Sequence, residues 1–211
     1  MARLRKAGRI WRRPEAQPAA ERVLYEGNAG LFEIDPVKLF EYEGPLEVEL
    51  GAGRGEFIIA RAVAFPKHNF LAVELSAAVT RLLAVRAGRR GLENVRVVRM
   101  DARTLVNLML PERSISAYHI YFPDPWPKQR HEKHRLFTPY FVASLGRTLA
   151  PGAPIYLATD VSDYAEAIFA MLEAGGFRRE AIAVPGAEET GFAHKFIAAG
   201  QPVHAAAFVA R

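Results

Sequence analysis

The sequence predicts a single α/β domain whose centre is a mostly parallel β-sheet of seven strands, with helices on both faces and an antiparallel strand near one edge. Beyond about residue 44, short runs rich in β-branched and aromatic residues alternate with segments of helical spacing, a pattern typical of βαβ units. The chain has 211 residues, half of them hydrophobic, which is enough for one sizeable core. The last two predicted strands have no helical segment between them, so we expect them to pair antiparallel at one side of the sheet.

Each predicted strand is a short apolar run bounded by turn residues. In chain order, the strands are predicted at residues 46–50, 69–75, 95–100, 115–122, 154–159, 177–184 and 204–210. Between them, apolar residues recur at helical spacing, and turn residues such as Gly88, Pro111, Gly152 and Gly175 close the segments. The helices are predicted at residues 57–65, 77–87, 102–109, 139–149 and 162–174.

Positive charge gathers in two parts of the chain. The formal net charge is +5, and Lys and Arg are concentrated in residues 1–13 and 128–135, which suggests an anionic macromolecule as partner. We interpret residues 1–20 as a basic arm that orders on RNA, with residues 16–20 as a flexible joint, and residues 21–211 as the folded domain. An organelle transit peptide can have the same basic composition, whereas the absence of an apolar h-region excludes a secretory signal.

The absence of cysteine excludes several kinds of chemistry. Without cysteine there is no disulfide, no thiolate nucleophile and no Cys-ligated zinc, and a reducing cytoplasm fits this composition. No set of His and acidic residues has metal-ligand spacing, so no metal is expected. No apolar run reaches the length of about 18 residues that a membrane span needs. His119, inside the fourth predicted strand, is interpreted as a hydrogen-bonded core residue.

Acidic residues recur where the predicted strands end. Four acids lie at or just after strand ends and a fifth lies near the end of the first strand; they are Glu74, Asp101, Asp124, Asp160 and Glu49. Ligands of open parallel sheets bind beyond the carboxyl ends of the strands. Each acid alone could be a helix cap or a solvated loop residue. Their recurrence at successive strand ends predicts a shared site.

The first strand runs into a tight glycine turn, Glu49-Leu50-Gly51-Ala52-Gly53-Arg54-Gly55-Glu56. Such a turn lets a ligand approach the backbone closely. Glu56 stands where the dinucleotide-binding fingerprint has its third glycine, and a carboxylate there opposes a pyrophosphate. The turn therefore suits a nucleoside without phosphates, with Glu74 accepting hydrogen bonds from ribose hydroxyls and Asp101 from an adenine amine.

The segment of residues 121–135 joins an acid fixed between prolines to a cationic stretch. The prolines lock φ and bias the preceding residues toward extended geometry, so we expect Asp124 and Trp126 to sit in a stiff turn after a strand. An arbitrary segment of this composition would be a solvated charge run. Trp126 could stack on an unstacked base or, equally well, pack under the loop as an anchor.

These motifs resemble a known family. The glycine turn followed by Glu74 and Asp101 resembles the cofactor pattern of the class I S-adenosylmethionine-dependent methyltransferases, which implies a Rossmann-like fold. The run Phe122-Pro-Asp-Pro-Trp-Pro-Lys128, with Arg130, His131 and Lys133 after it and Ala158-Thr-Asp160 and Tyr164 further on, resembles the signature of the bacterial tRNA (guanine-N7-)-methyltransferases. The resemblance extends from about Leu46 to the C-terminus.

The resemblance implies a role for each matching position. For S-adenosylmethionine, the implied binding residues are Glu49, Gly51, Gly53, Gly55, Glu74, Asp101 and Asp124. Asp124 is also the implied catalytic residue. For the tRNA substrate, the implied contacts are Lys128, Arg130, Lys133, Arg135, Asp160 and Thr190. One position departs from the family, because its Thr-x-x-Glu pattern reads Thr190-x-x-Ala193 here, which puts one substrate contact in doubt.

The implied activity is methyl transfer from S-adenosylmethionine to N7 of guanosine 46 in the tRNA variable loop, leaving S-adenosylhomocysteine. Guanine N7 has an exposed lone pair and no proton, so direct in-line displacement needs no general base and depends on alignment. We expect tRNA as partner, no obligatory protein partner, a monomer rather than a homodimer, and a cytoplasmic location.

Two other classes of function stay open at this stage. A class I methyltransferase acting on another RNA is one alternative. One acting on a small molecule or a protein would keep the pocket but leave the basic arm and residues 128–135 without a purpose. A noncatalytic RNA-binding protein that kept the fold is suggested only by Ala193.

Overall fold

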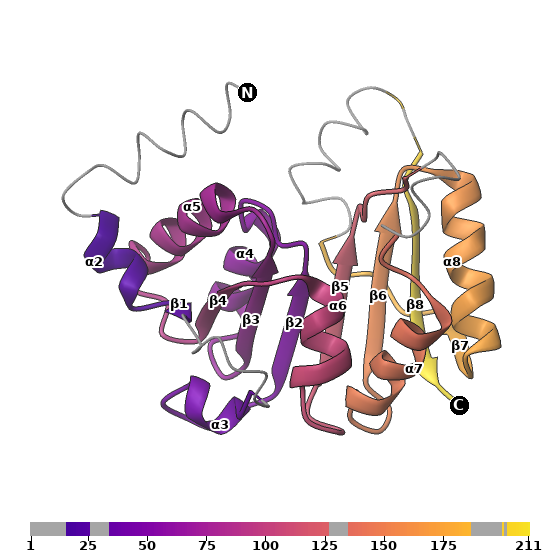
Figure 1. Cartoon of the computed structure of the whole chain (residues 1–211), viewed down its shortest axis with the longest axis horizontal. Coiled ribbons are helices and arrows are strands. Elements are labelled where there is room, and N and C mark those ends of the chain that lie inside the picture. Colours follow the sequence, from indigo (N-terminus) through magenta and orange to yellow (C-terminus); the bar gives the residue numbers. More distant parts are fainter. Residues whose placement is uncertain (1–15, 26–33, 127–134, 187–199, 201) are drawn as a thin grey trace.

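The computed structural model describes residues 16–25, 34–126, 135–186, 200 and 202–211, and a single sheet forms its centre (Figure 1). The strand order is β1-β4-β3-β2-β5-β6-β8-β7. The strands are β1 (Leu24–Tyr25), β2 (Leu46–Leu50), β3 (Asn69–Glu74), β4 (Val95–Arg99), β5 (Ala117–Tyr121), β6 (Pro154–Thr159), β7 (Phe177–Glu180) and β8 (His204–Ala210). Strands β1 to β6 pair in parallel, and β8 pairs antiparallel with both β6 and β7, which confirms the predicted arrangement.

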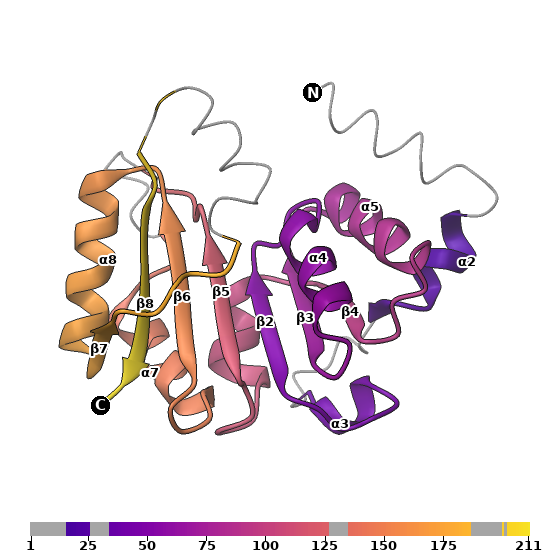
Figure 2. The same cartoon turned by 180° about the vertical axis from the view of Figure 1, so that it is seen from behind.

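Helices cover both faces of the sheet, as the two opposite views of Figures 1 and 2 show. The described helices are α2 (Ala16–Glu21), α3 (Pro36–Leu39), α4 (Glu56–Ala64), α5 (Ala77–Gly88), α6 (Ala102–Thr104) with its π-helical continuation η1 (Leu105–Met109), α7 (Pro139–Thr148) and α8 (Ser162–Ala174). Apolar residues of η1, α7 and α8 pack on one face, and those of α2, α4 and α5 pack on the other. None of the helices in the described ranges is long and apolar enough to cross a membrane.

Local sequence signals explain where the elements begin and end. All five residues of β2 are buried because both of its faces are covered, including its two glutamates, Glu47 and Glu49. Thr138 caps α7 by accepting a hydrogen bond from the Phe141 amide at 3.1 Å, and Pro139 follows at a position that needs no N–H. The predicted helices lie within a few residues of the observed ones.

Several parts of the fold differ from expectation. Helix α3 was not predicted, and β7 ends at Glu180 instead of residue 184. The sheet has an eighth strand, β1, whose two residues are too few to show any periodicity. Residues 16–20, expected as a flexible joint, form most of helix α2. Pro18 is tolerated because it lies in the first turn, where the amide has no partner inside the helix. Ala16 and Ala20 are fully buried. The backbone of Ala19 comes so close to Gly88 of α5 that a side chain at position 88 would clash with it.

A buried ionic cluster joins the central strands to α4. Glu47 of β2 is 2% exposed. Its carboxylate contacts Nε and Nη2 of Arg61, the Nη2 at 3.2 Å from Oε1, and it lies 2.7 Å from both Nδ1 of His68 and Nε2 of His119. Burial alone would raise the pKa of Glu47, but the hydrogen bonds from these three side chains lower it to about 2. The expectation that His119 is a hydrogen-bonded core residue is confirmed.

Replacing Glu47 by Ala should lower the free energy of unfolding by about 3–5 kcal/mol, because Arg61 would be left buried without its counter-charge. The measurement is urea denaturation at pH 7, with the exposed α8 residue Glu166→Ala as a control expected within about 0.5 kcal/mol of the wild type. The contribution of Glu47 should be complete above pH 4.5, its ordinary pKa, and should disappear as the pH falls toward 2. Equal losses for both variants would contradict this role.

Candidate functional site

The acids predicted at the strand ends lie along one edge of the sheet. Strands β4, β3, β2, β5 and β6 are neighbours and all parallel, so their carboxyl ends meet along the upper edge in Figure 1. In this order, the edge presents Asp101, Glu74, Glu49, Asp124 and Asp160. The order of neighbouring strands thus brings together residues that are up to 111 positions apart in sequence, from Glu49 to Asp160.

The glycine turn after β2 needs left-handed backbone at three positions. Gly51, Gly53 and Gly55 have φ angles of 79°, 54° and 72°. At Gly51 a Cβ would meet nothing within 4 Å, so the backbone angle and not crowding requires glycine, and the space above the turn is open. At Gly55 a Cβ would lie 2.7 Å from Cγ of Leu83, so this glycine also lets α4 begin against α5.

Glu74, the last residue of β3, is tied to the glycine turn. Its Oε2 accepts a hydrogen bond from the Gly53 amide at 3.1 Å, and its Oε1 accepts one from the Ser76 amide at 2.8 Å. These two bonds fix the carboxylate plane. Since a carboxylate oxygen can accept two hydrogen bonds, each of the two oxygens retains capacity for a ligand hydroxyl.

Glu49 differs from Glu74 in its surroundings. It is 4% exposed, and its Oε2 has no hydrogen-bond partner in the described structure. Burial raises its pKa well above the ordinary value of 4.5, and the nearby carboxylates of Glu56 and Glu74 raise it further, against a hydrogen bond from the Ile58 backbone. An unsatisfied buried carboxyl is costly, so this oxygen is the natural partner of a donor or cation that a ligand would bring.

Asp101 acts as a helix cap in this structure. Its Oδ1 accepts hydrogen bonds from the amides of Arg103 and Thr104 at 3.0 and 3.1 Å, which fixes the start of α6. Its predicted contact with an adenine amine stays a prediction. Leu75, directly after Glu74, is 63% exposed although it is a large apolar residue. The sequence analysis did not identify Leu75 as a candidate site residue. The available signal was an aliphatic residue next to Glu74 at the end of a strand.

The segment of residues 122–126 is held in an unusual conformation. Phe122 and Trp126 have φ angles of 52° and 40°, a region that bulky residues rarely adopt and that costs about 1–3 kcal/mol each. The Phe122 amide donates to the Ala158 carbonyl at 2.7 Å, which joins this segment to β6. Asp124 lies exposed between the two aromatic residues. The prolines predicted a stiff turn. Nothing in the sequence indicated that Phe122 and Trp126 would have left-handed backbone conformations.

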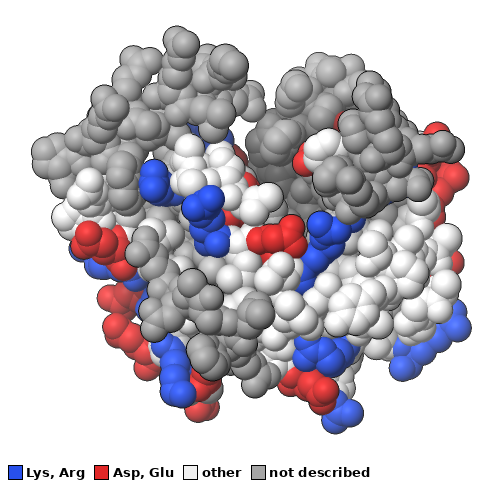
Figure 3. Space-filling model, in the orientation of Figure 1, with Lys and Arg blue, Asp and Glu red and all other residues white. Residues whose placement is uncertain are grey.

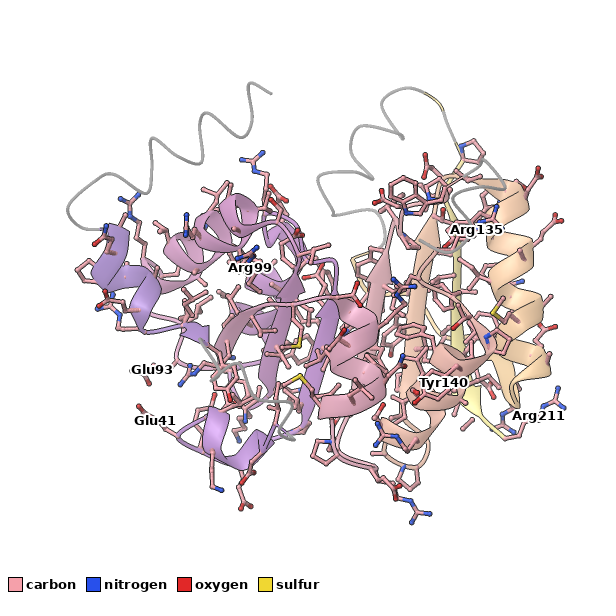
Figure 4. All side chains as sticks on the ribbon, in the orientation of Figure 1. Glu41, Glu93, Arg99, Arg135, Tyr140 and Arg211 are labelled. Atoms are coloured by element: carbon pink, nitrogen blue, oxygen red, sulfur yellow. The ribbon has the colours of Figure 1, made fainter. Side chains whose placement is uncertain are left out.

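Arg135 is the last residue of the cationic stretch, and its side chain contacts the segment of residues 122–126. It lies close to the upper end of α8 (Figure 4). Its Nε donates to the Pro125 carbonyl at 3.2 Å and its Nη2 to the Trp126 carbonyl at 3.4 Å. Its guanidinium lies 5.9 Å from the ring centre of Tyr164, a buried residue of α8 whose hydroxyl has no hydrogen-bond partner in the described structure.

Four of the predicted substrate contacts lie outside the described residues: Lys128, Arg130, Lys133 and Thr190. Ala193, the departure from the family pattern, lies outside them too. Asp160 follows β6 directly and is half-buried. In the space-filling view of Figure 3, acidic and basic side chains lie close together at the centre of the visible face, so the described part of this face has mixed charge.

Known proteins share both the sequence motifs and the fold. A family model described as "Putative methyltransferase" matches residues 43–204. The tRNA (guanine-N(7)-)-methyltransferase of Nitrosococcus oceani is 37% identical over 171 residues, which cover 80% of this chain and 72% of that protein. The protein of the same name from Psychromonas ingrahamii is 37% identical over 141 residues, or 67% of this chain.

A solved S-adenosylmethionine-dependent methyltransferase from Aquifex aeolicus superposes with a TM-score of 0.57 at 13% identity, covering 98% of this chain and 96% of that chain. This likeness confirms the predicted Rossmann-like class I methyltransferase fold. The chain spans less than two thirds of the length of most of the curated relatives compared, and 58% of the Psychromonas ingrahamii protein. The matched region includes the glycine turn and the proline-rich signature. The chain therefore belongs to the bacterial tRNA (guanine-N7-)-methyltransferase family.

Proposed function

We propose that the protein transfers a methyl group from S-adenosylmethionine to N7 of a guanosine in tRNA, at position 46 of the variable loop. The main support is the carboxyl edge of the sheet, where the glycine turn, Glu74 and the unsatisfied Glu49 adjoin the segment of Asp124 on the neighbouring strand β5. Family membership supplies the substrate class. A cytoplasmic location fits a tRNA substrate and a chain without cysteine.

The residues of this edge fit S-adenosylmethionine. Glu74 has accepting capacity for two ribose hydroxyls, and Leu75 offers an apolar surface beside it for the adenine ring. The open space above Gly51 admits the ligand close to the backbone. The unsatisfied Oε2 of Glu49 is suited to the methionine ammonium group. When bound, the cofactor supplies an electrophilic methyl group on its sulfonium.

The chain's own contribution to the reaction is alignment and electrostatics. Guanine N7 needs no deprotonation, and well-oriented reactants can gain roughly 7–11 kcal/mol over reactants in solution. Methylation leaves positive charge on the guanine, which the Asp124 carboxylate can stabilise from its fixed position. Asp124 or Asp160 can also accept hydrogen bonds from N1–H and the exocyclic amine of the base.

The tRNA must present its target base unstacked, because the major groove of A-form RNA is too deep and narrow for side chains to reach N7. Trp126 is half-buried and its carbonyl is bonded to Arg135, so either a stacking role or an anchoring role fits its position. Lys128, Arg130, Lys133 and Thr190 are proposed to bind the RNA, with the basic residues on phosphates, which gives affinity and orientation.

Labelled methyl transfer from S-adenosylmethionine to unmodified tRNA transcripts tests this function. A transcript with guanosine at position 46 should be labelled, and strand cleavage specific for N7-methylguanosine should map the product there. The matched control is the same transcript with adenosine at that position, which should take up no label. Equal labelling of both transcripts, or labelling at another atom, would refute the assignment of the site. No labelling despite binding of both substrates would refute the activity.

Replacing Asp124 by Ala should lower turnover by on the order of 10²-fold, because the charge that develops on guanine loses its partner. The dissociation constant for tRNA should change little, since most of the affinity for RNA comes from basic residues on phosphates. Single-turnover kinetics and filter binding measure the two quantities. Glu173→Gln, on an exposed part of α8, is the matched control and should behave as the wild type. Wild-type turnover in the Asp124 variant would remove its catalytic assignment.

Cofactor binding should release a proton from Glu49. The pKa of this carboxyl is raised well above 4.5 in the free protein, and an ammonium group beside Oε2 would favour the ionised form. Affinity for S-adenosylmethionine should therefore increase with pH from 4.5 up to the raised pKa, by at most about tenfold per pH unit.

Calorimetry in buffers of different ionisation enthalpy measures this proton release. Glu49→Gln keeps the shape of the side chain but cannot titrate, so it should bind weakly and without this pH dependence. The same pH dependence in the variant and the wild type would show that another group releases the proton.

A further inference from the structure

We propose that Arg135 is a positioning residue that holds the Asp124 segment in its reactive conformation, instead of a contact to RNA phosphate. Its place in the basic run of residues 130–135 had predicted a phosphate contact. The proposal rests on the proposed methyl transfer for its kinetic consequences, whereas the structural role of Arg135 can be tested without any substrate.

The hydrogen bonds of Arg135 point toward its own chain. Its Nε and Nη2 donate to the carbonyls of two consecutive residues, Pro125 and Trp126, at 3.2 and 3.4 Å. This is the two-pronged donor geometry for which a planar guanidinium is suited and a lysine ammonium is not. The side chain is half-buried, and it spans nine or ten residues of sequence to reach these carbonyls. A phosphate contact would instead need these N–H groups directed at solvent.

The bonded carbonyls belong to a segment that needs external support. Trp126 has a φ of 40° and Phe122 one of 52°, and conformations of this kind persist only when the surrounding structure enforces them. The Phe122 amide is held by β6 through Ala158. Arg135 holds the other end of the segment, so Asp124 lies between two fixed points.

Helix α8 contacts Arg135 through Tyr164. The Arg135 guanidinium lies 5.9 Å from the ring centre of Tyr164, a cation–π contact. Burial and the Asp124 carboxylate raise the pKa of the Tyr164 hydroxyl to about 12, and the Arg135 charge opposes that rise. The charges of both Asp124 and Arg135 therefore act on the same buried tyrosine.

Two substitutions separate positioning from phosphate binding. Arg135→Ala removes the charge and the hydrogen bonds, whereas Arg135→Lys keeps the charge but loses the two-pronged geometry. We expect kcat to fall in both variants, on the order of 10²-fold, because small displacements of an aligned group are costly. The slope of log tRNA affinity against log salt should be unchanged in both. Lys133→Ala is the matched comparison, and its slope should fall by about 0.7–0.9.

Tryptophan fluorescence reads the segment directly. The chain has two tryptophans, Trp11 and Trp126, so a Trp11→Phe background leaves Trp126 as the only reporter. In this background, both Arg135 variants should increase quenching of Trp126 by acrylamide, while Lys133→Ala should not. Circular dichroism verifies that each variant is folded. If Arg135→Ala does not fold, the test relies on Arg135→Lys.

The outcomes distinguish this inference from the proposed function. Unchanged quenching, with a reduced salt slope in Arg135→Ala that Arg135→Lys restores, would overturn the positioning role and reinstate the phosphate contact. Increased quenching in both variants would support the positioning role even if the wild type fails to methylate tRNA. Unchanged quenching and kcat in an enzyme that does methylate tRNA would refute the inference and leave the function intact.

Discussion

The loss of solvation of carboxylates on the fully buried strand β2 is the constraint on which the site depends. Glu47 and Glu49 lie two residues apart on the same strand, and both are nearly inaccessible to water. Glu47 meets Arg61, His68 and His119, which compensate its charge inside the domain. In the described structure, burial and the neighbouring acids Glu56 and Glu74 favour the neutral form of Glu49, and a cationic ligand group would favour its charged form. One strand thus carries a structural carboxylate, Glu47, and a carboxylate that is proposed to bind the ligand, Glu49.

Several unfavourable features of the described structure gather at the same edge. These are the unsatisfied oxygen of Glu49, the left-handed Phe122 and Trp126, and the unpartnered hydroxyl of Tyr164. Other such features lie elsewhere in the described structure, namely the unsatisfied side-chain oxygens of Asn69 and Asn107 and the left-handed Arg113. In the body of the fold, buried polar groups such as Tyr118 and Thr148 satisfy each other, here at 2.7 Å. Proteins tolerate local violations of this kind at functional sites, where the rest of the fold supplies the stability.

Much of the fold could be predicted because buried parallel strands and glycine turns have strong local patterns. The shared edge then followed from the general behaviour of such sheets, whereas the strand order was not predicted. The missed helix α2 shows where local rules fail, since its alanines gain stability from packing on Gly88 and not from any pattern of their own. The inward orientation of the Arg135 side chain could not be predicted either, because a run of basic residues does not indicate which side chain turns toward the protein. Asp101 was predicted to meet a ligand, with a helix cap as the alternative, and the structure shows the cap.

The need to hold the reacting groups in a fixed position explains why the bonded Glu74 and the strained segment of residues 122–126 occur together. In the proposed reaction, displacement at guanine N7 needs no proton transfer from the base, so the protein would accelerate it chiefly by fixing donor and acceptor in line. The donor side is fixed by Glu74, which is bonded to the glycine turn, and the acceptor side by a segment bonded to β6 and to Arg135. Both are attached to neighbouring parallel strands, whose spacing is set by the sheet. Backbone strain at Phe122 and Trp126 is therefore an acceptable cost, because a relaxed loop would let Asp124 move relative to the pocket that Glu49 and Glu74 define.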